Sequence, residues 1–157
     1  MHGMKVTHMK PHGALNNMAS EDQDLAEAIV RATKAVDPEI ILLATTGSEL
    51  MKAGATLDVP TASEVFADRT YDAKGNLTSR KRDDAMIRDP GQAVEHVLRM
   101  VETGKVRSTD GVDVPVLVHS ICIHGDEPTG PSVAAAVRAA LEAKGIEGVT
   151  LPEVPLN

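Results

Sequence analysis

A continuous apolar run at residues 40–44 constrains the fold more than any other feature of this sequence. It reads Ile-Ile-Leu-Leu-Ala and has no polar position that could face water, which is typical of a strand buried on both faces of a parallel sheet. Other strand patterns occupy residues 5–9, 62–67 and 116–123, and helical patterns occupy residues 20–36, 48–53, 89–103 and 131–144. Strands that alternate with helices predict an α/β fold with a parallel sheet. So few strands cannot close a barrel, so we expect an open sheet or part of a larger structure.

Local signals place the ends of these elements. Ser20 followed by Gln23 predicts a capping box at the start of the helix over residues 20–36, and Asp37-Pro38 ends that helix. Residues 68–84 are polar and contain a Lys-Gly-Asn turn signal, so we expect a surface loop of the kind that often carries function. The tail from residue 151, with two prolines, is expected to be extended or frayed.

Composition limits the possible partners and location of the protein. The 157 residues correspond to about one domain, residues 1–157. A net charge of −7, without any block of Lys or Arg, argues against nucleic acid, and one Phe, one Tyr and no Trp leave few rings for stacked bases. No apolar run approaches the roughly 18 residues of a membrane span. Residues 1–5 lack a signal-peptide pattern, so we expect a cytoplasmic protein without membrane contact.

Polar side chains follow three of the expected strands, where a core would not select them. Lys10 and His12 follow the first strand with equal parity, and His124 shares the parity of the last strand with Asp126 just beyond it. On the third strand Glu64 shares its parity with Asp68 just beyond the strand, and Arg69 follows. The carboxyl ends of parallel strands meet at one edge of a sheet, where functional groups gather in α/β folds. We therefore expect Lys10, His12, Glu64, Asp68 and His124 to share a pocket.

Three of these residues could also bind a metal ion. Imidazole and carboxylate suit zinc or manganese, and the candidate ligands are His12, His124 and Asp126. The alternative is that they hydrogen-bond one another or a substrate and bind no ion. Cys122 lies inside an apolar run, where burial keeps a thiol inert. Neither a GxxxxGK[ST] loop nor a GxGxxG loop occurs, so no known glycine-rich nucleotide motif is present.

Four motifs together resemble one protein family. Residues 6–17 read VTHMKPHGALNN and resemble the KPHGALYN motif of the LamB/YcsF family, the A subunits of 5-oxoprolinase. Residues 64–71, EVFADRTY, resemble that family's E-x-FADR-x-Y stretch. Residues 75–80, GNLTSR, resemble its G-x-L-x-x-R, and residues 119–128, HSICIHGDEP, resemble its H-S-I-C-V-H-G-D-x-P. The matches occur in the family's order and cover nearly the whole chain.

The resemblance implies a fold and an activity. The fold would be part of an incomplete (β/α) barrel of the glycoside hydrolase/deacetylase type, with parallel β/α units. The activity would be ATP-dependent opening of the lactam ring of 5-oxo-L-proline to L-glutamate, together with subunits B and C. A lactam is a stable amide, so its carbonyl oxygen needs phosphorylation or strong polarisation before water attacks. A divalent metal could also take part.

The resemblance also assigns roles to residues. The catalytic candidates are the charged and imidazole groups at the strand ends: Lys10, His12, Glu64, Asp68, His124 and Asp126. Lys10 would stabilise negative charge, the carboxylates would orient water or accept a proton, and the imidazoles would shuttle one. The substrate-binding candidates are Arg69, Arg80 and Asn16. Arg80 would hold the substrate carboxylate in a bidentate pair, while Asn16 stands where many relatives have Tyr.

Part of the family's pattern does not occur in this sequence. Family members are longer and begin with N-C-D-x-G-E, C-G-x-H-x-G-D and H-P-x-x-x-D motifs, none of which is found here. We therefore expect the chain to be the C-terminal portion of such a protein, a fragment whose N-terminal half could be encoded separately. Two alternatives stay open: an inactive remnant or partner-docking half of a split protein, and a metal-dependent hydrolase or deacetylase.

Overall fold

The computed structural model describes residue 3 and residues 5–156; Met1, His2, Met4 and Asn157 lie outside this part of the chain. The described chain divides into two compact units. The first unit contains the described residues up to Glu64 together with those from Val149 onward, and the second contains Val65–Gly148. A single domain over residues 1–157 stays a prediction.

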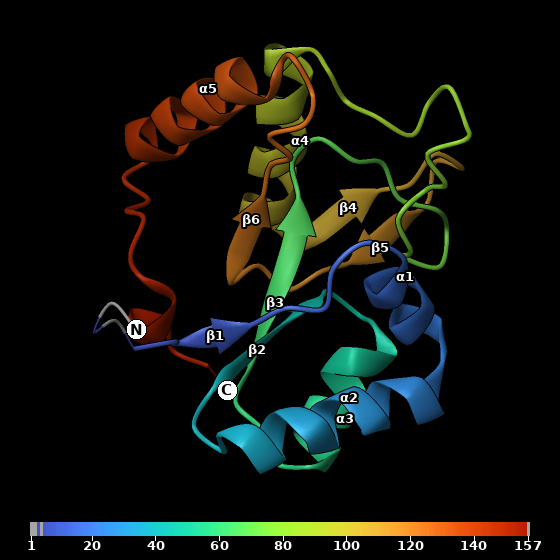
Figure 1. The fold of residues 1–157 in the computed structure, drawn as a ribbon. Helices are drawn as coiled ribbons and strands as arrows, with labels where there is room; N and C mark the ends of the chain where they lie inside the picture. The colour runs from blue at the N-terminus through green and yellow to red at the C-terminus, as the bar shows by residue number, and fades with distance from the viewer. Residues whose placement is uncertain (1–2, 4, 157) are drawn as a thin grey trace. The chain divides into compact units, whose positions relative to one another are not determined.

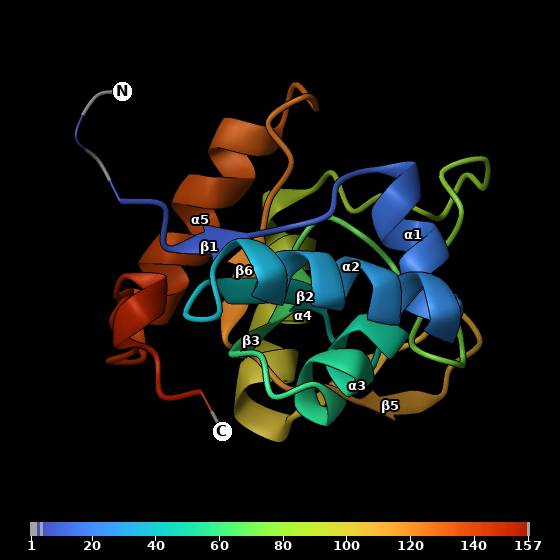
Figure 2. The same ribbon diagram turned by 60° about the horizontal axis from the view of Figure 1, so that its bottom comes forward.

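The first unit contains parallel strands covered by helices. Its elements, in chain order, are β1 (His8–Met9), α1 (Ala14–Glu21), α2 (Gln23–Val36), β2 (Ile41–Thr45), α3 (Glu49–Thr56), the first part of β3 (Thr61–Phe66) and a 3-10 turn, η1 (Leu151–Glu153). Strand β1 pairs in parallel with β2, and β2 pairs in parallel with β3, with Thr45 opposite Glu64. Figure 2 shows α2 and α3 lying side by side in this unit.

Strand β2 is buried along its whole length, which confirms the prediction from its apolar run. Leu42 and Ala44 belong to a core cluster with residues of α2 and α3. Ile41 and Leu43 belong to a different cluster, against which Leu151 of the tail packs. Because successive side chains of a strand point to opposite faces, the alternate residues among positions 41–44 serve two separate cores, and all four are apolar.

The start of the long helix differs from the sequence prediction. Residues 14–21 form α1, and α2 begins only at Gln23, where the Asp22 side chain accepts a hydrogen bond from the Leu25 N–H at 3.0 Å. The capping box assigned to Ser20 was therefore wrong, since the Ser20 hydroxyl donates to the Asn16 carbonyl inside α1 at 2.8 Å. Both Ser and Asp are good N-cap residues, and the local pattern does not say which of them is used.

The second unit begins with the end of β3. Its other elements are α4 (Pro90–Thr103), β4 (Lys105–Arg107), β5 (Asp113–Pro115), β6 (Ser120–Cys122) and α5 (Gly130–Ala143). The Ala67 N–H, just after β3, donates to the Cys122 carbonyl of β6 at 3.0 Å. Strands β4 and β5 form an antiparallel hairpin, and α4 and α5 pack against each other, as Figure 1 shows in the upper part of the ribbon.

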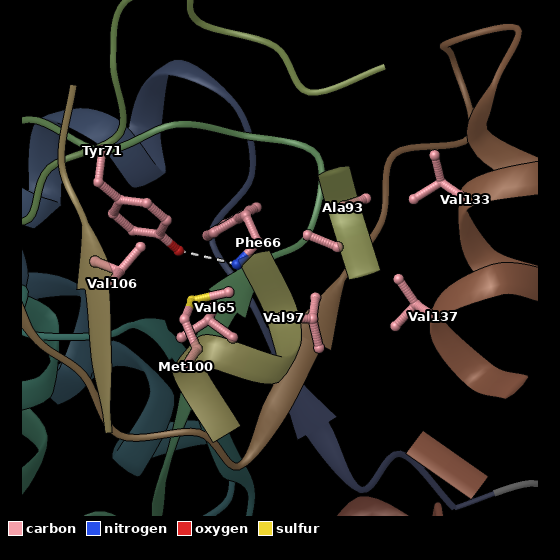
Figure 3. Close-up of a cluster of buried hydrophobic side chains, with 10 residues drawn as sticks. Val65, Phe66, Tyr71, Ala93, Val97, Met100, Val106, Val133 and Val137 are labelled. Atoms are coloured by element: carbon pink, nitrogen blue, oxygen red, sulfur yellow. Dashed lines mark hydrogen bonds between the residues drawn. The ribbon is translucent and has the colours of Figure 1, made fainter. Parts of the chain in front are cut away.

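The core of this unit contains both aromatic residues of the chain. Phe66 and Tyr71 are buried with apolar side chains from α4, α5 and β4 (Figure 3). The Tyr71 hydroxyl accepts a hydrogen bond from the Phe66 N–H at 2.9 Å. A side chain thus satisfies a backbone donor at the end of β3, inside the apolar core.

Several sequence predictions for this unit are confirmed and one is corrected. The helices over residues 89–103 and 131–144 are present, and Gly104 ends α4 in the left-handed region at φ +64°. The strand expected over residues 116–123 forms ladder contacts only over Ser120–Cys122, and the hairpin of β4 and β5 was missed. An apolar run alone does not make a strand, which requires a hydrogen-bonded partner along its length, and Leu117 of this run is exposed. Among the described residues, no helix is long and apolar enough to cross a membrane.

Gly54 lies inside α3 where β3 leaves no room for a side chain. A Cβ at this position would overlap the Thr61 hydroxyl and would lie 3.1 Å from the Thr61 Cβ. In a free helix interior, Gly→Ala stabilises by up to about 1 kcal/mol. We predict instead that Gly54→Ala lowers the free energy of unfolding, measured in urea, by about 1–3 kcal/mol because the site is overpacked. Gly148→Ala, where a Cβ meets nothing within 4 Å, is the control; a stable Gly54→Ala protein would contradict the prediction.

His96 on α4 makes the stability of this unit dependent on pH. Burial lowers the pKa of His96 below its ordinary value, while hydrogen bonding to the backbone at Arg69 and Phe66 opposes the shift. The unfolded chain therefore takes up this proton at a higher pH than the native state does. We predict that the stabilisation from neutral His96 is complete above about pH 6.5 and decreases as the pH falls below that value. Urea unfolding at pH 7.5 and 5.5 should show a smaller difference for His96→Asn than for the wild type, and an equal difference would contradict the prediction.

Candidate functional site

A buried carboxylate and an imidazole are paired in the second unit. Asp68, two residues after β3, is only 4 % exposed, and one of its oxygens accepts the His124 backbone N–H at 2.8 Å. Both Asp68 oxygens also lie 2.9 Å from Nδ1 of the His124 ring. Phe66 stacks on that ring with centroids 5.8 Å apart and planes 18° from parallel. The imidazole is therefore fixed in position and in rotation.

These contacts assign the protonation of the two ring nitrogens. A carboxylate only accepts hydrogen bonds, so Nδ1 of His124 carries the proton that faces Asp68. In the neutral ring, Nε2 is then the nitrogen with a lone pair, available to accept a proton. This arrangement, with a buried carboxylate behind an imidazole, is the one that general acid–base chemistry requires.

A glycine shapes the loop that presents His124. Gly130 is the first residue of α5, and a Cβ built on it would lie 2.5 Å from the carbonyl oxygen of His124. The contact is with backbone, so no side-chain rotation could relieve it. Gly130 thus allows the loop after His124 to approach the start of α5 closely.

The Arg69 guanidinium is buried and bonded to a loop. It donates to the carbonyl of Thr78 at 2.6 Å and to that of Ala85 at 3.4 Å. Burial lowers the pKa of Arg69, and the positive charge of Arg80 lowers it further. Arg69 therefore ties the polar loop after β3 to the strand end, and its direct contact with a substrate stays a prediction.

Two exposed ion pairs join that loop to the segment after β6. Arg80 Nη1 lies 3.3 Å from Asp126 Oδ2, and Arg88 Nε lies 3.0 Å from Glu127 Oε2. Hydrogen bonding to its own backbone N–H, and then to Arg80, lowers the pKa of Asp126. Both partners of the first pair are largely exposed, so a solute can reach them.

The first unit has its own polar cluster at strand ends. Lys10, just after β1, forms an ion pair with Glu64, whose side chain is 4 % exposed, while that of Lys10 is 23 % exposed. Glu64 lies opposite Thr45 of β2, and its carbonyl accepts the N–H of Thr46 at 2.9 Å. Pairing with the ammonium allows the carboxylate to be buried, since an unpaired charge there would be strongly destabilising.

Asn16 extends this cluster from α1. Its Nδ2 donates to the Thr45 hydroxyl at 3.1 Å, and the residue is 5 % exposed. Its Oδ1 is buried and has no hydrogen-bond partner among the described residues. A buried acceptor without a partner lowers stability by about 1–3 kcal/mol. A bound group that donates a hydrogen bond to this Oδ1 would recover that free energy. The role of Asn16 as a substrate contact nevertheless stays a prediction.

The remaining candidates are less organised. His12 is exposed in the turn before α1. Across the described part of the chain, no group of three His, Cys, Asp or Glu side chains could hold a metal ion. The structure thus provides no such group for the candidates His12, His124 and Asp126. It brings together Lys10 with Glu64 in one unit and Asp68 with His124 in the other, and a pocket shared by all five predicted residues stays a prediction.

Sequence reasoning missed the residues that support the pair. Phe66 was not among the predicted site residues, although it stacks on His124. Gly130 and the hydroxyl of Tyr71 act through the backbone, and a single sequence carries little signal for such contacts. The chain has one Phe and one Tyr, and both lie in the core of this unit. Their rarity was a signal that could have directed attention to Phe66 and Tyr71.

Parallel strands with polar side chains gathered after their carboxyl ends place the protein in the α/β class whose sites form at that edge. The chain belongs to the LamB/YcsF family, whose sequence model matches residues 1–155. It is 45% identical over 154 residues to the 5-oxoprolinase A subunit of Halalkalibacterium halodurans, covering 98% of this chain and 59% of the relative. It is 49% identical over 144 residues to that of Shouchella clausii, covering 92% and 57%.

A solved structure is similar over the same extent. The crystal structure of the lactam utilization protein from Thermus thermophilus matches with a TM-score of 0.83 and 39% identity, covering 92% of this chain and 57% of that one. The predicted family and parallel β/α fold class are therefore confirmed. The chain spans 59% and 57% of the lengths of the two curated relatives named above, and its interpretation as a C-terminal portion stays a prediction.

Gly130 provides a test of how His124 is held. We predict that Gly130→Ala lowers the free energy of unfolding by about 1–3 kcal/mol, because the new methyl group collides with backbone. The ring ¹⁵N shifts of His124 should also move away from those of the tautomer protonated at Nδ1. Gly125→Ala, where a Cβ meets nothing within 4 Å, is the matched control. Unchanged shifts in Gly130→Ala would show that His124 does not depend on this contact.

Proposed function

We propose that the protein acts as the A subunit of a 5-oxoprolinase, in the hydrolytic opening of the lactam ring of 5-oxo-L-proline to L-glutamate. The observation that carries the proposal is the buried Asp68–His124 pair in a member of the LamB/YcsF family. Relatives named as the A subunit of 5-oxoprolinase and a structural neighbour named a lactam utilization protein support it. We assign the activity to a cytoplasmic complex with subunits B and C.

In the proposed reaction, His124 is the general base. Its Nε2 takes a proton from water as the water oxygen bonds to the lactam carbonyl carbon, and the ring becomes an imidazolium. Asp68 keeps Nδ1 protonated and stabilises the positive charge through the 2.9 Å contact. When the carbon–nitrogen bond breaks, Nε2 returns the proton to the departing nitrogen, which becomes the amine of glutamate. The imidazole ends the cycle neutral.

Lys10 and Glu64 are proposed to contribute through charge. The Lys10 ammonium would stabilise negative charge on an oxygen of the reacting group, and Glu64 would hold the ammonium in place. Their pairing also explains why an acidic side chain can be kept buried at the end of β3. This assignment rests on the family resemblance of the KPHG and FADR motifs.

The ATP requirement of the proposed activity comes from the family resemblance. The sequence has no glycine-rich phosphate loop of a known type. We therefore assign the ATP requirement to the assembled complex, and no step above passes through the nucleotide.

The decisive experiment is reconstitution. The chain is co-expressed with subunits B and C of a relative, with and without a polypeptide for the unmatched portion, and glutamate formation from 5-oxo-L-proline is measured with and without ATP. We expect ATP-dependent glutamate formation when all parts are present. Its absence from the complete set would overturn the proposal and would favour an inactive remnant.

Substitutions of the pair test the mechanism. We predict that His124→Gln and Asp68→Asn each lower kcat by at least ~100-fold, the scale of general acid–base catalysis. Asn at position 68 would donate to Nδ1, and the ring would then carry its proton on Nε2 and could not act as a base. His119→Gln is the matched control, because that histidine has no assigned role. Near-normal turnover of both variants would exclude His124 as the base.

A further inference from the structure

The Arg80–Asp126 ion pair differs from the other arginine–carboxylate pairs of this loop. Arg82 holds Asp84 with two hydrogen bonds, at 2.9 and 2.7 Å, and Arg88 holds Glu127 with two, at 3.0 and 3.5 Å. Arg80 contacts Asp126 through one nitrogen only, at 3.3 Å. The Arg80 and Asp126 side chains are 48% and 66% exposed. A single long hydrogen bond in water holds the guanidinium weakly.

The positive charge of Arg80 and of the neighbouring Arg69 favours binding of an anion in addition to the Asp126 carboxylate. Its charge acts on Arg69, whose own pKa is lowered by burial first and by Arg80 second. The Arg69 guanidinium is bonded to neutral carbonyls, and the Asp68 carboxylate faces His124. Among the described residues, Asp126 is thus the one carboxylate that forms an ion pair with Arg80. A guanidinium can bind a carboxylate through two parallel hydrogen bonds, which Asp126 does not provide.

The location connects this pair to the candidate base. Asp126 follows His124 by two residues in the segment after β6, and the ion pair places Arg80 against that segment. A substrate carboxylate on Arg80 would therefore be anchored beside the imidazole. A lactam with an α-carboxylate has its reacting carbonyl a few bonds away from that anchor, which suits the base at His124.

We propose that Asp126 is a placeholder: its carboxylate occupies Arg80 in the empty protein, and the carboxylate of the substrate displaces it. The inference rests on the proposed function and adds to it a role for Asp126, which positions Arg80 and takes no proton in the reaction. Binding then exchanges one weak hydrogen bond for a bidentate pair. Lactams without a carboxylate gain nothing from the exchange, so the Arg80–Asp126 pair also selects the substrate.

The test compares two lactams in the reconstituted complex, 5-oxo-L-proline and 2-pyrrolidinone, which lacks the carboxylate. We predict that Asp126→Asn lowers KM for 5-oxo-L-proline by about 2–5-fold, because an exposed ion pair no longer competes. KM for 2-pyrrolidinone should not change. Arg80→Gln should raise KM for 5-oxo-L-proline by about 10–100-fold, and in that background Asp126→Asn should have no further effect.

The control is Glu127→Gln, which removes the same charge one residue away from a carboxylate that pairs with Arg88. It should not lower KM for 5-oxo-L-proline, and an equal decrease would mean that general electrostatics explains the effect. A fall of kcat by ~100-fold in Asp126→Asn with both lactams would make Asp126 a proton acceptor and overturn the proposal.

Calorimetric binding separates this inference from the proposed function. The dissociation constant of 5-oxo-L-proline is measured with the wild-type complex and with the Asp126→Asn complex. If the complex binds 5-oxo-L-proline without opening it, the proposed function fails, and tighter binding to Asp126→Asn still supports the placeholder. Binding that Asp126→Asn does not tighten, or no binding at all, overturns the placeholder whatever the activity.

Discussion

The buried carboxylate of Asp68 is the constraint on which the second unit depends. It accepts both the backbone N–H and the ring N–H of His124, so one charged group satisfies two donors from a segment 56 residues away. A carboxylate buried to this degree is tolerated only with such partners. The same contacts that make its burial possible also orient the imidazole, so stability and the proposed chemistry rest on a single interaction.

The polar clusters show how charge is kept at strand ends without loss of stability. Glu64 is neutralised by Lys10, Asp68 is bonded to His124, and the guanidinium of Arg69 is bonded to the carbonyls of a loop. Arg80 and Asp126 differ, because they are exposed and weakly joined. Groups held by several partners are suited to fixed positions, whereas a weakly held pair is suited to exchange with a ligand.

Much of the fold was predictable because it follows from short-range patterns. The apolar run at residues 40–44 predicted a strand buried on both faces, and the helical pattern over residues 89–103 predicted α4. Prediction failed where two local signals competed or where pairing decided the outcome. Asp22 rather than Ser20 caps α2, and the strand at 116–123 is limited to Ser120–Cys122 by its hydrogen-bonded partner.

The sequence by itself determined the residue types at the strand ends, their parity and the family motifs that contain them. It did not determine which side chains meet, since the pairs Lys10–Glu64 and Asp68–His124 join residues 54 and 56 positions apart. Only the tertiary structure decided that Arg69 serves the loop, that Phe66 stacks on His124 and that Gly130 makes room for its backbone. The physical reason is that these contacts depend on packing between distant segments, and periodicity and capping signals report only on neighbours in the chain.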